Sequence, residues 1–349
     1  VTDFVFNRDY ISLFCAYINR DILNNSLKKS IHELGPKYTP DANVETKITK
    51  ILNAFVFSNK FQREFDEFLN TLEEKTKQLK NKEEVYLNAN TFKDIKKCLE
   101  NFILKSKDES NKEYLNKFAK ELILEIWRFN DNLIYFNSNN EEITNEESIN
   151  CRQYTATFDF IREFFIDDIE IVLNNNVLIV EGEAGIGKSH TIADFLLTLE
   201  NECICILELG QFFINESEDP WCKIIRKLGF SIGKNEFFNN LRKYSDLYGK
   251  QVVLAIDALN EGKGCSYWKN HLRGLVFECM DNNIKLILTV RSEYKDLIFK
   301  KDLLENKNIS LIQHNGFMGF EQAAIKRYCQ FYGFVEPVFL WSLIFIGIH

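Results

Sequence analysis

The sequence is poor in proline and has no excess of positive charge. Only 4 of its 349 residues are proline, and because proline interrupts helices, its scarcity together with long amphipathic stretches indicates a helix-rich protein. The formal net charge of −8 argues against a general nucleic-acid or membrane-surface binder, although a local basic patch is compatible with it. A hydrophobic content of 45% is enough for real cores in such a chain.

The nine cysteines include no C-x-x-C pair, so the commonest zinc and dithiol motifs are missing. Cys203 and Cys205 lie in an apolar run, and we interpret them as buried thiols rather than as metal ligands. An odd number of cysteines without a disulfide framework suits a reducing cytosol, so we expect a cytoplasmic protein.

The chain has no charged-then-apolar leader and begins at Val1 rather than at Met, which suggests a fragment. Near the other end, residues 338–348 are apolar except for Ser342 and Gly347. This run is shorter than the roughly 20 residues that span a bilayer. We interpret it as a core helix cut short, with a membrane segment continuing beyond His349 as the alternative.

The first 150 residues are predicted to form a helical region. Apolar residues recur at helical spacing over 48–79, opposite a charged face, and again over 91–135. This predicts two long amphipathic helices, which usually pack as a hairpin or bundle. The polar stretch 137–150 is predicted to be a linker, and a helix over 154–173 leads to the next segment. No catalytic pattern occurs in this part of the chain.

The strongest signal follows, where the apolar strand 177–180 runs into a glycine-rich turn and then a helical pattern. The turn matches G-x-x-x-x-G-K-[ST] throughout, and the predicted nucleotide-binding residues are Gly182, Glu183, Ala184, Gly185, Ile186, Gly187, Lys188, Ser189 and the adjoining His190. Glycines let successive N–H groups point inward at a phosphate, beside the positive end of a helix. We expect Lys188 to reach the β and γ phosphates and Ser189 to bind Mg²⁺. A chance match to the pattern is the alternative.

Strands and helices alternate after this turn. Strands are predicted at 202–209, 251–256, 285–290 and 309–313, and helices at 221–228, 236–248, 267–279 and 321–331. Alternation of this kind predicts βαβ units. The expected fold is therefore α/β, a P-loop NTPase parallel sheet over 151–334 with helices on both faces, preceded by the all-helical region.

Two further strands end in polar residues. Asp257 follows the apolar run 252–256, and ligands sit at the carboxyl ends of parallel strands, so we expect Asp257 to hold Mg²⁺. Glu261 lies one turn further on and could orient or deprotonate an attacking water. Arg291 ends the strand 286–290 and could reach the γ-phosphate. A strand-capping Asp257 and a solvent-facing Arg291 are the alternatives.

Three segments together resemble the NACHT/STAND class of signalling P-loop NTPases: the Walker A motif at 182–189, Asp257-Ala258-Leu259-Asn260-Glu261, and Thr289-Val290-Arg291. The middle segment departs from the commoner Asp-Gly-Leu-Asp-Glu pattern at Ala258 and Asn260. Asn260 removes one acid, which leaves Glu261 as our choice of hydrolytic base. Two weaker stretches, 37–45 and 314–321, resemble prokaryotic antiviral STAND proteins.

This resemblance implies an ATP- and Mg²⁺-dependent switch with slow hydrolysis, in which nucleotide-bound cores form homo-oligomers and activate an effector. A further region would sense a foreign, phage-derived protein, and residues 335–349 would begin a helical or winged-helix segment. No Asn-Lys-x-Asp box occurs, which agrees with adenine rather than guanine. The alternatives are an AAA-type mechanical ATPase acting on DNA or protein, and an inactive truncated remnant.

Overall fold

The computed structural model describes residues 20–40, 43–79, 89–107, 124, 145–165, 169–173 and 175–334. The chain divides into two compact units. The sheet unit comprises the described residues up to Thr49 and from Asn176 onward, and the helical unit is Lys50–Asn175. The helical unit is therefore an insertion in the sequence of the sheet unit.

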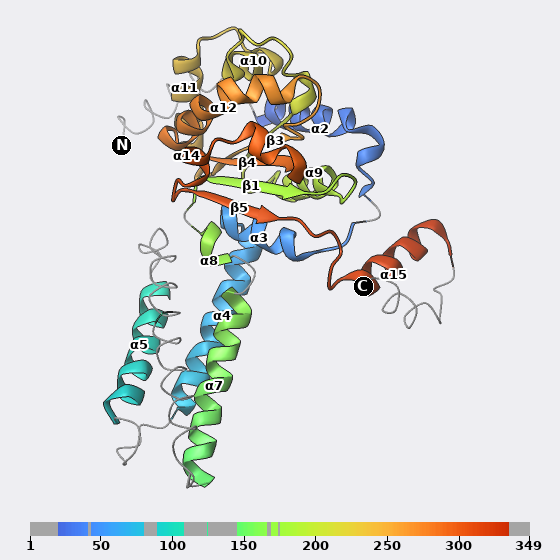
Figure 1. Cartoon of the computed structure of the whole chain (residues 1–349). Helices are drawn as coiled ribbons and strands as arrows, with labels where there is room; N and C mark the ends of the chain where they lie inside the picture. The colour runs from blue at the N-terminus through green and yellow to red at the C-terminus, as the bar shows by residue number, and fades with distance from the viewer. Residues whose placement is uncertain are drawn as a thin grey trace. The chain divides into compact units, whose positions relative to one another are not determined.

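The sheet unit is built on five parallel strands in the order β2-β3-β4-β1-β5. Figure 1 labels β3, β4, β1 and β5 among them. The strands are β1 (Val177–Gly182), β2 (Ile204–Leu209), β3 (Val252–Asp257), β4 (Ile284–Arg291) and β5 (Ile309–Gln313). β2 and β3 are buried along their whole length, as expected for strands with both faces covered. The predicted α/β class, with a parallel sheet between helices, is confirmed.

Helices cover both faces because successive strand residues point to opposite sides. Ile204 and Ile206 of β2 belong to one large apolar cluster with the buried residues of α10 (Pro220–Lys227), α11 (Lys234–Tyr248) and α12 (Gly264–Asp281). α9 (Lys188–Thr198) packs instead against β2 and β3 from outside that cluster. The remaining short elements are η4 (Gly210–Phe212), η5 (Ser292–Tyr294), α13 (Lys295–Ile298), α14 (Lys301–Leu304) and α15 (Glu321–Tyr332).

The edge strand β2 is covered by α2 (Arg20–Glu33), which comes from the start of the described chain. α2 buries Leu23, Leu27 and Ile31. The predicted boundary at residue 150 therefore differs from the structural division, since residues 20–49 lie with the sheet and 151–175 lie with the inserted helices. The sequence placed residues 20–33 within a helical region but carried no information on which core would bury their apolar side chains.

The helical unit contains α3 (Lys47–Val56), α4 (Asn59–Gln78), α5 (Ala89–Lys107), α7 (Asn145–Phe165) and α8 (Ile169–Val172). The prediction of one helix over 48–79 is wrong. Phe57 adopts a positive φ of 52°, and the Ser58 side chain accepts a hydrogen bond from Phe61 N at 3.2 Å to begin a new helix. Stacked phenylalanines join α4 to α7, with 4.1 Å between the ring centroids of Phe68 and Phe164.

Two other boundaries in this unit also differ. Residues 145–150, predicted as part of a linker, belong to α7, and the predicted helix 154–173 is represented by α7 and α8. The linker residues 137–144 lie outside the described chain, as do 335–349 and most of 108–135. Among the described residues, no helix combines the length and apolar character needed to cross a membrane.

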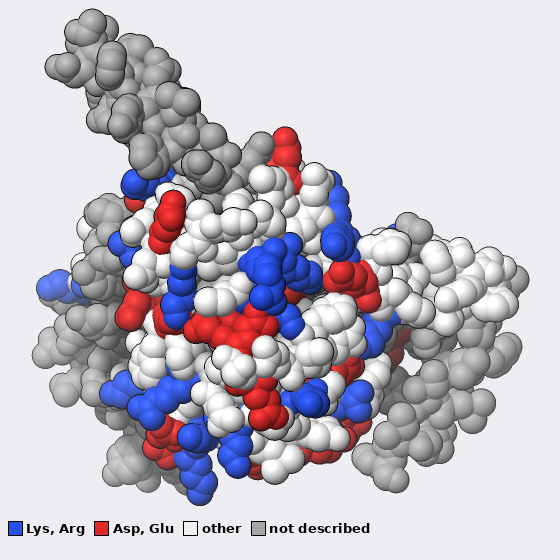
Figure 2. All heavy atoms as spheres, turned by 90° about the horizontal axis from the view of Figure 1, so that it is seen from above, with Lys and Arg blue, Asp and Glu red and all other residues white. Residues whose placement is uncertain are grey.

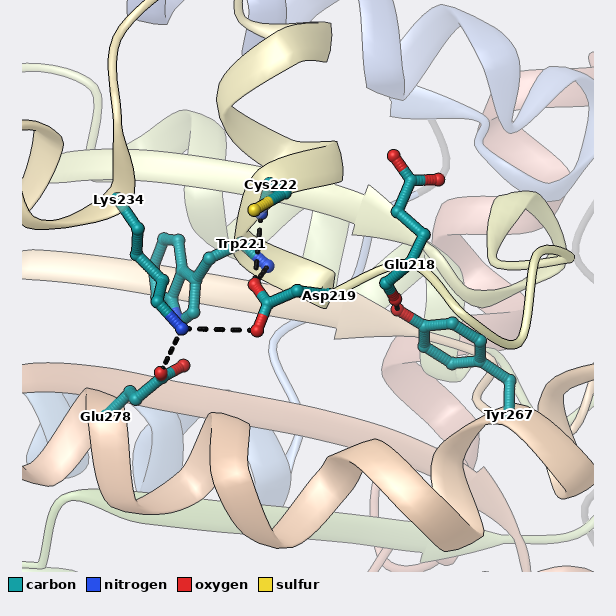
Figure 3. Close-up of polar contacts among 7 residues, drawn as sticks. All are labelled: Glu218, Asp219, Trp221, Cys222, Lys234, Tyr267 and Glu278. Atoms are coloured by element: carbon teal, nitrogen blue, oxygen red, sulfur yellow. Dashed lines mark hydrogen bonds and ion pairs between the residues drawn. The ribbon is translucent and has the colours of Figure 1, made fainter.

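A polar network ties α10, α11 and α12 together (Figure 3). Asp219 caps α10 by accepting hydrogen bonds from Trp221 N at 2.9 Å and Cys222 N at 3.1 Å. Its other oxygen pairs with Lys234 at the start of α11, and Lys234 also pairs with Glu278 of α12. Each group in this network has a structural partner, so we assign it to helix packing.

On one face of the sheet unit, acidic and basic side chains lie next to each other (Figure 2). Figure 2 shows basic and acidic side chains interspersed on the face seen from above. Arg226, for example, pairs with Glu218 at 2.6 Å. Nucleic-acid binding generally requires a continuous positive field, and this face does not present one.

Glu208 is a fully buried acid on β2. Its Oε2 accepts a hydrogen bond from Lys227 Nζ at 3.1 Å, and Lys227 also donates to Ser30 and Glu33 of α2. Burial raises the pKa of Glu208 to about 7, although Lys227 opposes the change. The folded chain thus keeps a proton on Glu208 at pH values where the unfolded chain has released it.

We expect this group to make the folded chain less stable as the pH rises. The contribution of Glu208 to the free energy of unfolding should fall by roughly 3 kcal/mol as the pH rises through the interval between its unfolded and folded pKa values. Denaturant unfolding of wild type and Glu208→Gln across this pH range measures this contribution, as the difference between the unfolding free energies of the two proteins at each pH. A difference that does not vary with pH would contradict the assignment.

Candidate nucleotide-binding site

The glycine-rich turn connects the end of β1 to the start of α9. Gly187 caps α9 with a φ of 100°, and Gly185 has a φ of 77°, which are conformations that side chains other than glycine rarely adopt. A Cβ on Gly182 would lie 2.8 Å from the backbone oxygen of His314. The turn therefore needs glycine for its own curvature and for the close approach of the segment after β5.

Lys188 lies within this turn. Its Nζ donates to the backbone oxygens of Gly182 and Glu183, both at 2.7 Å. Burial lowers the pKa of Lys188, with Asp257 raising it and Arg291 lowering it. Within the described part of the chain the ammonium thus has two backbone carbonyls as hydrogen-bond partners, and charged phosphate oxygens would be stronger acceptors.

Asp257 ends β3 beside the glycine-rich turn. Its Oδ1 accepts a hydrogen bond from Thr289 Oγ1 at 2.6 Å. Burial raises the pKa of Asp257, while Thr289 and the nearby Ser189 lower it. Among the described residues, Oδ2 has no hydrogen-bond partner of normal geometry although it is buried. Such an orphaned carboxylate oxygen next to a serine hydroxyl fits the hard oxygen ligands that Mg²⁺ prefers.

Most of the predicted site residues surround one open cleft of about 190 Å³. It is lined by Lys37, Ala184, Gly185, Ile186, Gly187, Lys188, Ser189, His190, Asp257, Ala258, Asn260, Glu261, Thr289 and Arg291. Gly182 and Glu183 do not line it and contribute through their carbonyls to Lys188. The structure therefore brings the three predicted motifs to the same edge of the sheet.

The turn after β3 accommodates both departures from the resembled pattern, Ala258 and Asn260. Ala258 has a positive φ of 57°, a conformation in which glycine is favoured. Its N–H donates to Thr289 Oγ1 at 2.7 Å, which holds the turn despite the alanine side chain. Asn260 Oδ1 accepts from Arg291 N at 3.1 Å. Asn260 thus joins the ends of β3 and β4, a role that sequence reasoning missed.

Glu261 does not stand alone in the cleft. Both of its carboxylate oxygens accept hydrogen bonds from Lys37 Nζ, at 2.7 and 2.9 Å. Lys37 was not among the predicted site residues. Its only sequence signal was membership of the weak 37–45 resemblance, since nothing in the spacing links residue 37 to residue 261.

The segment that carries Lys37 is docked on α9. The Tyr38 ring lies 5.3 Å from the His190 ring, and Thr39 N donates to His190 Nδ1 at 3.2 Å. Tyr38 and Asn43 also hydrogen bond to the Asp194 side chain. His190, predicted to contact nucleotide, therefore has a second role in the structure as an anchor for this segment.

His314 packs behind the glycine-rich turn. Its backbone N–H donates to Glu181 O at 2.7 Å, and its Nδ1 accepts from Gly316 N at 2.9 Å. Burial and, secondarily, the charge of Lys188 lower the pKa of His314 to about 4. The neutral imidazole can accept the Gly316 hydrogen bond, whereas the protonated ring cannot.

His314 should influence stability in the opposite direction to Glu208. The unfolded chain gains a proton at His314 that the folded chain does not, so stability should fall by roughly 3 kcal/mol as the pH drops through the interval between the two pKa values. The test compares wild type with His314→Asn, which retains an acceptor for Gly316. We expect the unfolding free energy of wild type minus that of His314→Asn to rise with pH. A difference that stays constant or falls as the pH rises would refute this.

A comparison with known proteins finds no matching family model and no matching curated protein. The assignment of the site therefore depends on its geometry and on the sequence motifs. Within the described residues, no group of three or more histidine, cysteine or acidic side chains could by itself hold a metal ion. Cys203 and Cys205 are buried free thiols. A metal at the cleft would thus need a ligand such as phosphate to complete its coordination by Ser189 and Asp257.

Proposed function

We propose that the chain is the ATP-binding core of a STAND-type signalling switch, which binds ATP with Mg²⁺ and hydrolyses it slowly in the cytoplasm. The observation that carries this proposal is the convergence of Lys188, Ser189 and Asp257 at the carboxyl edge of a parallel sheet. Glycine-rich turns at helix N-termini bind phosphate, and strand-end acids position Mg²⁺. The orphaned Asp257 oxygen supports the same reading.

Each residue has a separate role in this proposal. The N–H groups of the turn and the Lys188 ammonium bind and orient the phosphates, and Ser189 and Asp257 hold the metal. When bound there, Mg²⁺ would supply positive charge to offset that of the transferring phosphoryl group. Glu261 accepts the proton of the attacking water, and Arg291, close enough to affect the pKa of Lys188, faces the developing charge.

The signalling role is supported by the resemblance of 182–189, 257–261 and 289–291 to NACHT/STAND proteins. An antiviral role, nucleotide-linked homo-oligomerisation and activation of an effector follow from that resemblance. A switch needs a ligand that prefers one state by about 5.5 kcal/mol to move a population from 1:99 to 99:1. Phosphate contacts from three different strand ends could supply such a preference.

Calorimetry of ATP–Mg²⁺ binding tests the proposal. We expect Lys188→Ala to weaken binding on the order of 100-fold, because two phosphates lose their charge-assisted hydrogen bonds from the lysine ammonium. Lys28→Ala is the matched control, since Lys28 does not line the cleft. Its Nζ pairs instead with Glu200 Oε1, at a distance of 3.0 Å. GTP should compete poorly with ATP. Equal binding by wild type and Lys188→Ala, or no binding by either, would overturn the proposal.

A further inference from the structure

Among the described residues that line the cleft, Lys37 is the one that precedes β1 in the sequence. It is the last residue of η1 (Gly35–Lys37), and the residues after it are anchored on α9 through His190 and Asp194. The backbone at Lys37 is thus fixed to the same helix whose first turn carries Lys188 and Ser189. Its side chain reaches across the cleft to Glu261 on the turn after β3.

The Lys37–Glu261 ion pair lies in the same cleft as Lys188, Ser189 and Asp257. Lys37 is close enough to lower the pKa of Asp257, and Glu261 is close enough to raise it. Asp257 is also near Ser189. Lys37 therefore lines the same cleft as both proposed metal ligands, Ser189 and Asp257.

The pair can exchange partners at low cost. The Lys37 side chain is 45% exposed and that of Glu261 is 22% exposed, and ion pairs of this kind contribute little to stability. A terminal phosphate carries more charge than one carboxylate and offers several acceptor oxygens. Lys37 would therefore prefer the phosphate when the two compete for it.

We propose that Lys37 senses the terminal phosphate: on binding of a nucleoside triphosphate it moves from Glu261 to that phosphate and releases the Glu261 carboxylate. This inference rests on the proposed nucleotide site. A nucleoside diphosphate has no phosphate at that position, so Lys37 remains on Glu261. One lysine thereby couples recognition of the triphosphate to exposure of the acid proposed to act on water, and it makes the cleft discriminate between ATP and ADP.

The test measures the Mg²⁺ complexes of ADP and of an ATP analogue with a β,γ-imido bridge by calorimetry. Lys37→Gln should weaken binding of the ATP analogue roughly 10-fold, because one charge-assisted contact is lost, and should leave ADP binding within about twofold. Lys37→Arg should largely restore the preference, because it keeps the charge. Lys28→Gln, which removes a similarly exposed lysine outside the cleft, should change neither affinity.

A double-mutant cycle separates exchange from simple attraction. Glu261→Gln frees Lys37 from its carboxylate, so it should tighten binding of the ATP analogue in the wild-type background but not in Lys37→Gln.

Equal weakening of ADP binding and ATP-analogue binding by Lys37→Gln would show that Lys37 only stabilises the structure of the cleft, and it would overturn the inference. No change in either affinity would also overturn it. If wild type binds neither nucleotide, the proposed function fails as well, whereas normal wild-type binding with unaltered discrimination refutes only the sensor.

Discussion

Asp257→Asn should abolish most nucleotide hydrolysis while making the folded protein more stable. The asparagine keeps an oxygen to accept the hydrogen bond from Thr289 Oγ1, and it removes the charge that burial disfavours. The same charge is what would hold Mg²⁺ beside Ser189. We therefore expect hydrolysis to fall on the order of 100-fold, a typical effect of removing one preorganised electrostatic group, while the thermal midpoint of the protein without nucleotide rises.

Glu208→Gln is the matched control for this prediction. Glu208 is also a buried acid, and it lies near the end of β2, the strand next to β3. It directly precedes Leu209, which pairs in register with Asp257. It does not line the cleft, so its replacement should leave hydrolysis unchanged. Steady-state phosphate release and thermal unfolding measured on both variants separate the two effects. An Asp257→Asn protein that keeps wild-type hydrolysis would remove Asp257 from the site.

Gly264→Ala should be the most destabilising small substitution in the sheet unit. Gly264 begins α12, and a Cβ there would lie 1.8 Å from the backbone oxygen of Leu259. A backbone atom cannot rotate away as a side chain can, so the turn that carries Asn260 and Glu261 would have to move. We expect a loss of about 3 kcal/mol in unfolding free energy, the upper end of typical overpacking.

Gly274→Ala provides the opposite outcome in the same helix. A Cβ on Gly274 would meet no atom within 4 Å, and glycine in a helix interior costs roughly 0.5–1 kcal/mol relative to alanine. This substitution should therefore stabilise the protein by about that amount. Denaturant unfolding of the two variants beside wild type measures both changes. If Gly264→Ala unfolds within 0.5 kcal/mol of wild type, roughly the scatter of a neutral surface change, the tight turn is misassigned.

The strands and the glycine-rich turn were predictable because their signals are local. β5 begins and ends at the predicted residues, and the other predicted strands differ from the structure by one or two residues at their ends. The Walker A pattern fixed the position of the turn because backbone curvature there requires glycine. The break at Phe57 and Ser58 escaped prediction because the apolar residues on each side of it have helical spacing. The interval of six residues from Phe55 to Phe61 does not fit one continuous helical face, and this signal was overlooked.

The long-range contacts of the site were not predictable from one sequence. Lys37 and Glu261 are separated by 224 positions, and neither composition nor spacing indicates that their side chains meet. Asn260 and Thr289 lay within recognised motifs, but their roles depend on how two neighbouring strands end. Such tertiary hydrogen bonds become visible only when the sheet order is known.

The contact between α2 and β2 has a consequence for how the protein is made. About 170 residues separate Glu33 from Ile204, so at ribosomal elongation rates of roughly 5–20 residues per second, β2 emerges on the order of ten seconds or more after α2. During that delay Leu23, Leu27 and Ile31 lack the strand that will shelter them. The nascent chain thus exposes the apolar face of an amphipathic helix to chaperones until the intervening helices and β2 have been synthesised.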